Sequence, residues 1–281
     1  MNPYQIQPQS ILRISGGRTS AFMLRQILDA HGGALPPKTV AVFCNTGKEH
    51  ESALNFMHEL ETRWCPIVWL EYRWSDGAHA FVEVDYCHAS RNGEPFDQVI
   101  AARSANRVEN GGEDGTLPTP RSRFCTTELK IRTSNRYAKT LGWDYWTSVV
   151  GLRADEPSRA QRIKGDCADE DISCPMYRAG HTEADVLAFW KTQPFDLLLP
   201  NNDHAFGNCD LCFLKKRAKI EKIIQTDPKA AEWWAQKEEL AKCTFRIDRP
   251  SYRNMIKLMA EQWRIWQDQI EDETLPCACT D

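Results

Sequence analysis

The chain has 281 residues, 42% of them hydrophobic and 26% charged, with a net charge of −4 at pH 7. These values are ordinary for a globular protein with one large core, and they exclude a uniformly basic coat for nucleic acid. No apolar run approaches the roughly 18 residues that cross a bilayer, and the first ten residues lack the apolar core of a signal peptide. We therefore expect a cytoplasmic protein with no membrane partner; nucleic acid is permitted as a partner but not indicated.

The first predicted strand, residues 11–14, ends in a Gly-Gly turn that opens onto a helix running to about residue 30. Glycines there allow positive φ and close backbone approach, and the N–H groups of the first helical turn face an anion. The residues that would hold the anion, as backbone or hydroxyl donors or as a charge, are Ser15, Gly16, Gly17, Arg18, Thr19 and Ser20. We interpret this loop as a phosphate-binding turn; an ordinary glycine turn with a Ser/Thr helix cap is the alternative.

The next elements repeat the same order. A strand over residues 39–43 is followed by an amphipathic helix over 49–63, and a third strand follows at 67–72. This βαβαβ order predicts an α/β fold whose parallel sheet binds ligands at the carboxyl ends of its strands. Asn45 and Gly47 follow the second strand, so we expect them to approach the ligand; a simple strand-end turn is the alternative.

The remaining chain divides into three stretches. Residues 76–120 are rich in Gly, Asn, Pro and charge and predict an excursion over the active face, with a short helix at 96–103. A helix over 126–141 then leads to a strand at 145–150. Beyond residue 182 the pattern is mainly helical, with helices expected over 183–192, 214–226, 229–243 and 251–270. We expect a nucleotide-binding α/β domain over 1–200 and a helical region over 201–281 that carries the C-x-x-C and the tail cysteines.

Eleven cysteines are many for a reducing compartment, where disulfides seldom persist. Cys209 and Cys212 form a C-x-x-C turn before a basic helix. Two thiolates at that spacing can bind one metal ion or cluster, and a helix N-terminus favours their deprotonation. The tail adds Cys277 and Cys279 after the last predicted helix.

Five motifs in order make a resemblance specific. They are Ser15-Gly-Gly-Arg-Thr-Ser20, Asn45-Thr-Gly-Lys-Glu49, Arg123-Phe-Cys-Thr-Thr-Glu-Leu-Lys130, Gly151-Leu-Arg-Ala-Asp-Glu156 and Gly207-Asn-Cys-Asp-Leu-Cys-Phe-Leu-Lys215. In this order they resemble the phosphoadenosine phosphosulfate reductase-like family of the PP-loop, or adenine nucleotide α-hydrolase-like, superfamily. The chain is most similar to the branch, often encoded by phages and prophages, that carries a C-terminal cysteine pair. The resemblance extends from about residue 11 to residue 279.

The resemblance implies a Rossmann-like PP-loop core that binds an adenine nucleotide. The loop would hold either the pyrophosphate of ATP or the sulfate end of an adenylyl sulfate, with Gly151 beside it. Lys130 and Arg153 would hold phosphate or sulfate oxygens, Arg as a fork and Lys as a point charge. Arg18 stands where many members have Lys, and Thr19 where the ATP-cleaving members usually have Asp.

The resemblance also implies a four-iron four-sulfur cluster. Cys125 matches the first cysteine of the family's upstream pair, Thr126 replaces the second, and Cys209 and Cys212 match the downstream pair. Cys277 or Cys279 from the tail would supply the fourth ligand, with Cys277 preferred, or one iron would stay open. A structural zinc is one alternative, because thiolate sets of this kind serve both metals, and plain thiols or a redox disulfide are the other.

The implied activity is reduction of adenylyl sulfate or its phosphorylated form, with Cys279 as a mobile nucleophile and an electron or sulfur donor protein as partner. Two alternatives stay open. One is an ATP-dependent sulfurtransferase that thiolates a nucleic acid or nucleotide. The other is a zinc-stabilised nucleotide-binding module without catalysis.

Overall fold

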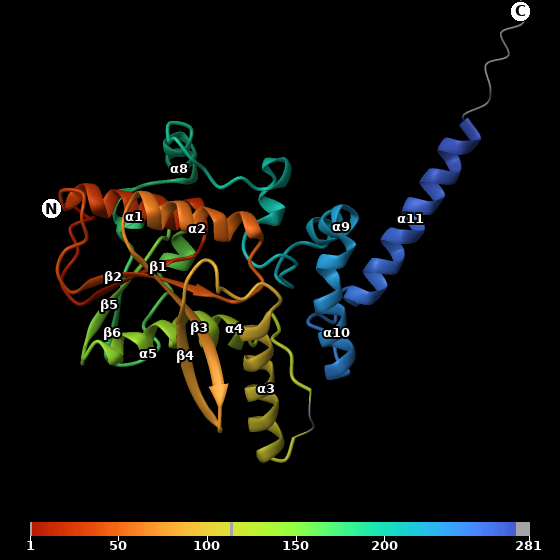
Figure 1. Cartoon of the computed structure of the whole chain (residues 1–281), viewed down its shortest axis with the longest axis horizontal. Coiled ribbons are helices and arrows are strands. Elements are labelled where there is room, and N and C mark those ends of the chain that lie inside the picture. Colours follow the sequence, from red (N-terminus) through yellow and green to blue (C-terminus); the bar gives the residue numbers. More distant parts are fainter. Residues whose placement is uncertain (1, 113–114, 274–281) are drawn as a thin grey trace, which may run out of the picture.

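A mainly parallel sheet forms the centre of the fold, in a computed structural model that describes residues 2–112 and 115–273 (Figure 1). Its strands follow the order β4-β3-β2-β1-β5-β6. Their bounds are β1 Ser10–Ile14, β2 Thr39–Asn45, β3 Ile67–Ser75, β4 Ala78–Val84, β5 Trp146–Val150 and β6 Glu170–Ser173. Only β4 runs antiparallel, against β3. The predicted α/β class with a parallel sheet is confirmed.

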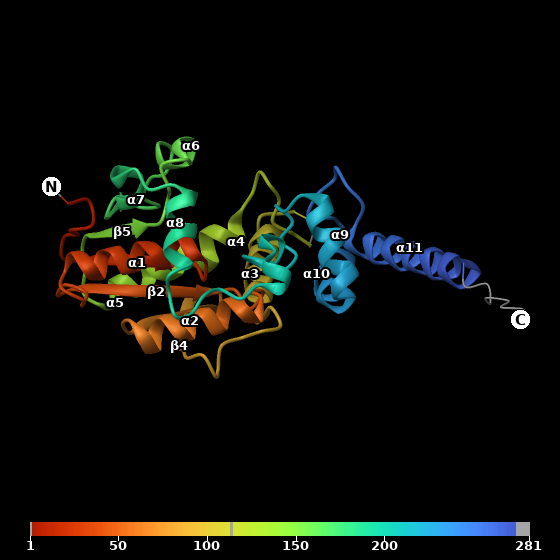
Figure 2. The ribbon, with the colours of Figure 1, turned by 90° about the horizontal axis from the view of Figure 1, so that it is seen from above.

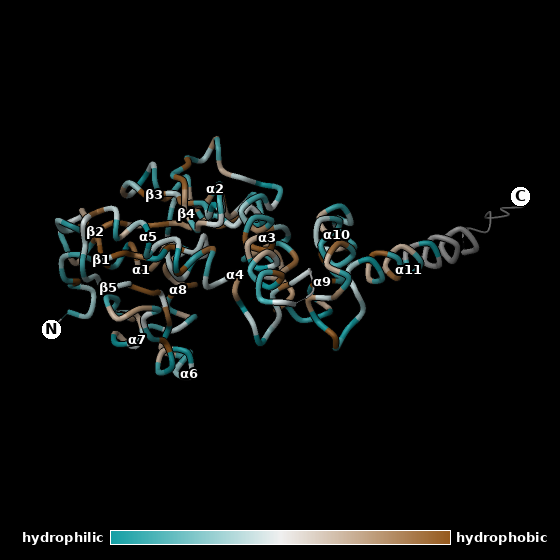
Figure 3. The backbone as a smooth tube through the Cα atoms, turned by 90° about the horizontal axis from the view of Figure 1, so that it is seen from below, coloured by the Kyte–Doolittle hydropathy of each residue, from teal (hydrophilic) through white to brown (hydrophobic). Residues whose placement is uncertain are grey.

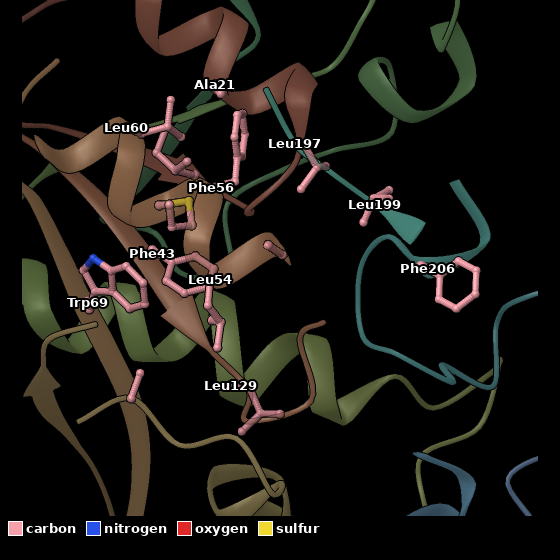
Figure 4. Close-up of a cluster of buried hydrophobic side chains, with 14 of the residues drawn as sticks. Ala21, Phe43, Leu54, Phe56, Leu60, Trp69, Leu129, Leu197, Leu199 and Phe206 are labelled. Atoms are coloured by element: carbon pink, nitrogen blue, oxygen red, sulfur yellow. The ribbon is translucent and has the colours of Figure 1, made fainter. Parts of the chain in front are cut away.

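Helices cover both faces of the sheet. Because side chains alternate across a strand, Phe43 of β2 joins the core under α1 (Arg18–Ala30) and α2 (Glu51–Arg63), while its neighbour Val42 faces α5 (Thr133–Thr140). Figure 4 shows Phe43 and Trp69 of the sheet in one cluster with Leu54, Phe56 and Leu60 of α2. The two packed layers fix the carboxyl ends of the strands as one rigid edge.

Two strands and one long helix differ from the sequence prediction. Residues 76–120 contain β4 and α3 (Glu94–Glu109) in addition to irregular chain. The helix expected over 126–141 begins earlier, as α4 (Phe124–Thr126), continues as the π-helical turn η1 (Thr127–Arg132) and ends as α5. Strand β6 was not predicted at all, because its four residues are mostly polar.

Between β5 and α9 the chain forms short helices, in addition to strand β6. The helices are α6 Pro157–Ala160, α7 Pro175–Ala179, α8 Glu183–Trp190, η2 Pro200–Asn202 and η3 His204–Phe206. Helix α8 packs beside α1, and the segment that follows it passes the start of α1.

The C-terminal part is helical, as predicted, and consists of α9 (Arg217–Thr226), η4 (Pro228–Ala231), α10 (Glu232–Ala241) and α11 (Tyr252–Glu273). Figures 1 and 2 show α11 leaving the body of the molecule in both views. In Figure 3 hydrophobic residues recur along the central strands and within these helices. Within residues 2–112 and 115–273 we find no helix with the length and apolarity that a membrane span requires.

Candidate functional site

A pocket of about 620 Å³ opens where the carboxyl ends of β1 and β5 meet. Four segments supply most of its lining: the Gly-Gly loop and first turn of α1 (residues 15–19), the start of the helix at 123–130, the chain after β5 (151–159) and the thiol loop (207–215). Thr46, α8 and the chain at 197–199 also contribute. From β1 the chain crosses to β2 on one side, while β5 and β6 lie on the other, so the pocket occupies a topological switch point. Each of these four segments contains residues of a motif singled out in the sequence.

The Gly-Gly loop has two different glycines. Gly16 has φ +72°, and an added Cβ would lie 3.5 Å from the Phe43 ring, so it needs glycine for its conformation. Gly17 has φ −117°, caps α1 without a side-chain hydrogen bond, and an added Cβ would approach only Ser15 Oγ, at 3.8 Å. The positive φ expected of both glycines thus holds for Gly16 alone. The N–H groups of the first turn of α1 therefore have no side-chain cap at Gly17, and residues 17–19 line the pocket.

Ser20 holds the loop closed. Its hydroxyl accepts from the Ser15 backbone N–H and donates to the Gly17 carbonyl, each at 3.0 Å. The residue is buried and does not line the pocket, whereas Ser15, Gly16, Gly17, Arg18 and Thr19 do.

Arg18 is already paired. Its Nε and Nη2 donate to the two carboxylate oxygens of Asp196, each at 2.7 Å, and Nη2 also donates to the Leu197 carbonyl at 3.0 Å. Trp190 Nε1 donates to the Arg18 carbonyl. Arg18 therefore ties the segment after α8 to the start of α1, and Asp196 neutralises the charge expected to meet the anion.

Asn45 and Gly47 do not line the pocket. The Asn45 amide donates to Glu71 Oε1 (2.7 Å) and to the Ser90 carbonyl (2.8 Å), and its oxygen accepts from Gly47 N–H. Gly47 has φ +73°, with Gly93 backbone atoms 3.0 Å from an added Cβ. In this structure the pair builds the strand-end turn.

Lys130, from η1, and Arg153, from the chain after β5, both line the pocket. Lys130 Nζ lies 3.5 Å from Glu49 Oε1, and Arg153 Nε donates to Asp155 at 2.8 Å. Gly151 also lines the pocket, and an added Cβ there would lie 3.2 Å from Ser20 Cα, so glycine lets β5 end close against α1.

The thiols of Cys125, Cys209 and Cys212 open onto the same pocket. Burial raises the pKa of each. The charge of Cys212 further raises the pKa of Cys125, while Lys130 acts to lower that of Cys209. Burial therefore keeps these thiols protonated when they have no ligand. A bound metal ion, or added positive charge nearby, would favour loss of the proton and formation of the thiolate.

The metal prediction is only partly met by the described residues. Three thiols are the right kind of donor, but within residues 2–112 and 115–273 no three Cys, His, Asp or Glu side chains gather closely enough to hold a metal ion. Cys277 and Cys279 lie outside the described residues. All cysteines in the described part of the chain are free thiols.

The pocket lining is electropositive, with six Lys or Arg residues against two Glu. Among the residues that the structure describes, no carboxylate lies in ion-pair distance of Arg123 or Lys215; the Lys215 ammonium donates to the carbonyls of Ala205 and Gly207. Both act to lower the pKa of Cys212. An anionic ligand is thus favoured at the thiol end as well as at the Gly-Gly loop.

Sequence reasoning gave no role to Lys48, Glu49 or Asp210, which join two of the motifs. Lys48 Nζ lies 2.9 Å from Asp210 Oδ2, and the Asp210 N–H donates to the Lys48 carbonyl at 2.7 Å. Glu49 pairs with Cys209 in an isolated antiparallel bridge. The sequence did offer a signal for this role: Lys48 and Glu49 are adjacent charged residues in a motif at the end of a buried strand. Charged residues are rarely buried without partners, so the two were candidates for tertiary ion pairs.

No protein-family model matches the chain. The chain is 30% identical over 225 residues to the uncharacterised nin region protein ORF290 of Escherichia phage lambda, an alignment that covers 75% of this chain and 68% of that protein. It is 25% identical over 260 residues to an uncharacterised 37.8 kDa protein of Escherichia phage 186, with 80% and 74% covered.

Two solved structures are similar in part. One is a phosphoadenylyl-sulfate (PAPS) reductase from Candida auris in a phosphate complex, with a TM-score of 0.39, 13% identity, and 68% of this chain and 79% of that one covered. The other is the U34-tRNA thiolase NcsA from Methanococcus maripaludis with its [4Fe-4S] cluster, with a TM-score of 0.38, 14% identity, and 98% and 77% covered.

Proposed function

The chain belongs to the family of the phage lambda nin region protein ORF290, and from its pocket we propose that it is a PP-loop enzyme of sulfur metabolism that binds an adenine nucleotide. The preferred reaction is reduction of an adenylyl sulfate or its phosphorylated form. ATP-dependent thiolation of a nucleic acid or nucleotide is the competing reaction.

One observation carries this proposal: the Gly-Gly loop and three cysteines open onto a single pocket. At about 620 Å³ the pocket lies in the range of small-molecule sites. The uncapped start of α1 supplies N–H donors for an anionic tail, and the lining adds positive charge. A nucleotide whose anionic end reaches both the loop and the thiols suits this arrangement.

The side chains have distinct roles in the proposal. Lys130 and Arg153 would hold sulfate or phosphate oxygens, with Asp155 orienting the Arg153 guanidinium. Thr19 and Ser15 would add hydroxyl donors beside the backbone amides. Gly151 would keep the end of β5 clear of the ligand.

The three pocket thiols would hold an iron-sulfur cluster, with Cys277 as the fourth ligand or one iron left open. Soft thiolate donors suit iron-sulfur clusters and zinc alike. When bound, a cluster would supply electron transfer, or an open iron that binds a sulfur ligand, at the thiol end of the pocket. A protein carrying zinc and lacking turnover would instead be a nucleotide-binding module.

The reductase reaction balances with a dithiol. A thiolate, assigned to Cys279, attacks the sulfur of the adenylyl sulfate, the sulfur–oxygen bond to phosphate breaks, and AMP leaves with its oxygen. A thiol of a donor protein then attacks the cysteine sulfur of the S-sulfocysteine, sulfite leaves, and a disulfide remains. The donor dithiol reduces that disulfide, so it supplies the two electrons.

The deciding assay offers ATP, adenylyl sulfate and phosphoadenylyl sulfate in parallel with a dithiol reductant, under anaerobic conditions. Sulfite with AMP or its phosphorylated form, and without pyrophosphate, supports the reductase. Pyrophosphate or AMP from ATP without sulfite supports ATP-dependent thiolation. Absence of all products, with zinc and no iron in the protein, would contradict both reactions.

A further inference from the structure

Glu49 is a buried acid that faces the pocket lysine. Only 1% of its side chain is exposed. Its Oε2 accepts from the backbone N–H and the hydroxyl of Thr46, at 2.9 and 2.8 Å, and its Oε1 lies 3.5 Å from Lys130 Nζ. The carboxylate is thus fixed by neutral donors on one oxygen and offers the other to the ammonium. An acid buried this deeply is retained only with such partners.

Glu49 also lies against the thiol loop. Its backbone pairs with Cys209, and the Thr46 hydroxyl that holds its carboxylate lies 3.6 Å from Cys209 Sγ. The next ion pair along, Lys48 with Asp210, fixes the same two segments. The position of the Glu49 carboxylate is therefore set jointly by the β2 end and the thiol loop.

Lys130 and Glu49 differ in their access to ligand. Lys130 lines the pocket with a third of its side chain exposed, whereas Glu49 does not line it. Within residues 2–112 and 115–273, Glu49 is the one carboxylate in ion-pair distance of Lys130. A lysine on a flexible four-carbon stem has no fixed geometry of its own, so its ammonium takes the position that its partner dictates.

We propose that Glu49 is a positioning residue that holds the Lys130 ammonium beside Cys209, where it meets the anionic group of the bound nucleotide. The inference rests on the proposed function, because it takes the pocket to bind a nucleotide by its anionic tail. It adds a statement about specificity: Glu49 should affect the affinity for the anionic group of the ligand and not the affinity for its nucleoside.

Calorimetry with ATP and with adenosine tests this role. We expect Glu49→Gln to weaken ATP binding about tenfold, the equivalent of one charged hydrogen bond, and to leave adenosine binding unchanged. In a Lys130→Ala background the same change should have no further effect on ATP, because Glu49 acts through Lys130. Glu51→Gln is the matched control: Glu51 lies two residues on, pairs with Arg91 near the surface, and should leave both affinities unchanged.

A second variant covers the case in which Glu49→Gln does not fold. Thr46→Val removes the hydroxyl that fixes the carboxylate while keeping both charges, and should weaken ATP binding about threefold in the wild type and not at all with Lys130→Ala. Equal losses for ATP and adenosine, or losses that add to that of Lys130→Ala, would overturn the role of Glu49. A wild-type protein that binds adenosine as well as ATP would instead overturn the proposed function itself.

Discussion

At the scale of single residues, Gly17 gives the sharpest test of the anion site. Its φ is ordinary and an added Cβ meets no close neighbour, so Gly17→Val should fold with a melting temperature near that of the wild type. The new side chain would stand before the uncapped N–H groups of α1, and we expect ATP binding to be lost in calorimetry.

Gly16→Ala is the contrasting variant, because its positive φ of +72° is strained for any residue with a side chain. It should lower the melting temperature. ATP binding that survives Gly17→Val at wild-type strength would show that the anion does not lie at this turn.

Arg18 yields a second prediction, because Asp196 already neutralises it. Arg18→Gln should destabilise the fold by about 1–3 kcal/mol through loss of charged hydrogen bonds. Its effect on ATP affinity should be smaller than that of Lys130→Ala. Thermal melts and calorimetry on the two variants check this, and a normal melt with abolished ATP binding would make Arg18 a direct anion ligand.

The sequence motifs predicted correctly which segments come together at the pocket. They predicted less well which side chains in those segments line it. Ser15 and Thr19, Lys130 and the paired cysteines follow from residue types at strand ends. Asn45 instead bonds to Glu71 and Ser90, and Arg18 to Asp196, 178 residues away in sequence. Such partners are fixed by tertiary packing, which local spacing does not encode.

At the scale of elements, the π-helical turn η1 is held by Glu128. Its carboxylate accepts from Arg132 at 2.6 Å and Arg136 at 2.9 Å. Burial alone would raise the pKa of Glu128, but the two arginines outweigh it and hold the pKa below its ordinary value. The ionised form therefore stabilises the fold above the unfolded-state pKa, and this contribution is lost as pH falls through the folded-state pKa.

Glu128→Gln should accordingly lower stability at pH 7 by about 2 kcal/mol. The difference from wild type should shrink as the pH falls from about 5 toward 3. Thermal melts across that range measure it. A difference that stays constant with pH would mean that the loss comes from packing and not from charge.

Helices and strands could be predicted where the hydrophobic periodicity and the length of the segment indicate the same kind of element. Strands β1 to β3 and helix α1 carry clear apolar periodicity. Strand β4 had its own signal, since Asp76 and Gly77 form a tight turn with φ of +52° and +76°, typical of a two-residue hairpin. Strand β6 carries no such sequence signal, because its four residues are mostly polar. Its buried Glu170 is held by an ion pair with Arg13 of β1, which is distant in sequence.

At the scale of the whole molecule, the tail cysteines decide between two roles. Helix α11 has 22 residues and projects from the rest of the molecule in Figures 1 and 2. Cys277 and Cys279 follow it in sequence, outside the described residues. We expect anaerobically purified protein to hold about four irons per chain. A Cys277→Ser, Cys279→Ser double variant should lose sulfite release.

Iron analysis of that variant separates the roles. Iron retained without turnover assigns a nucleophile to the tail, and iron lost assigns a ligand. Cys209→Ser is the comparison, since Cys209 lines the pocket and its loss should reduce iron in either case. A double variant with normal iron and normal sulfite release would remove the tail from the mechanism.

The thiol loop is held in place by residues that the ribosome adds about 40 positions later. Arg249 donates to the carbonyls of Phe213 and Lys215, and the Tyr252 hydroxyl donates to that of Leu211. During synthesis these carbonyls have no such partners until the ribosome has added roughly 40 more residues, which takes about 2–8 seconds. Cys209 and Cys212 are thus synthesised before the groups that hold their loop, so the loop can take its folded form only after residue 252 has been added.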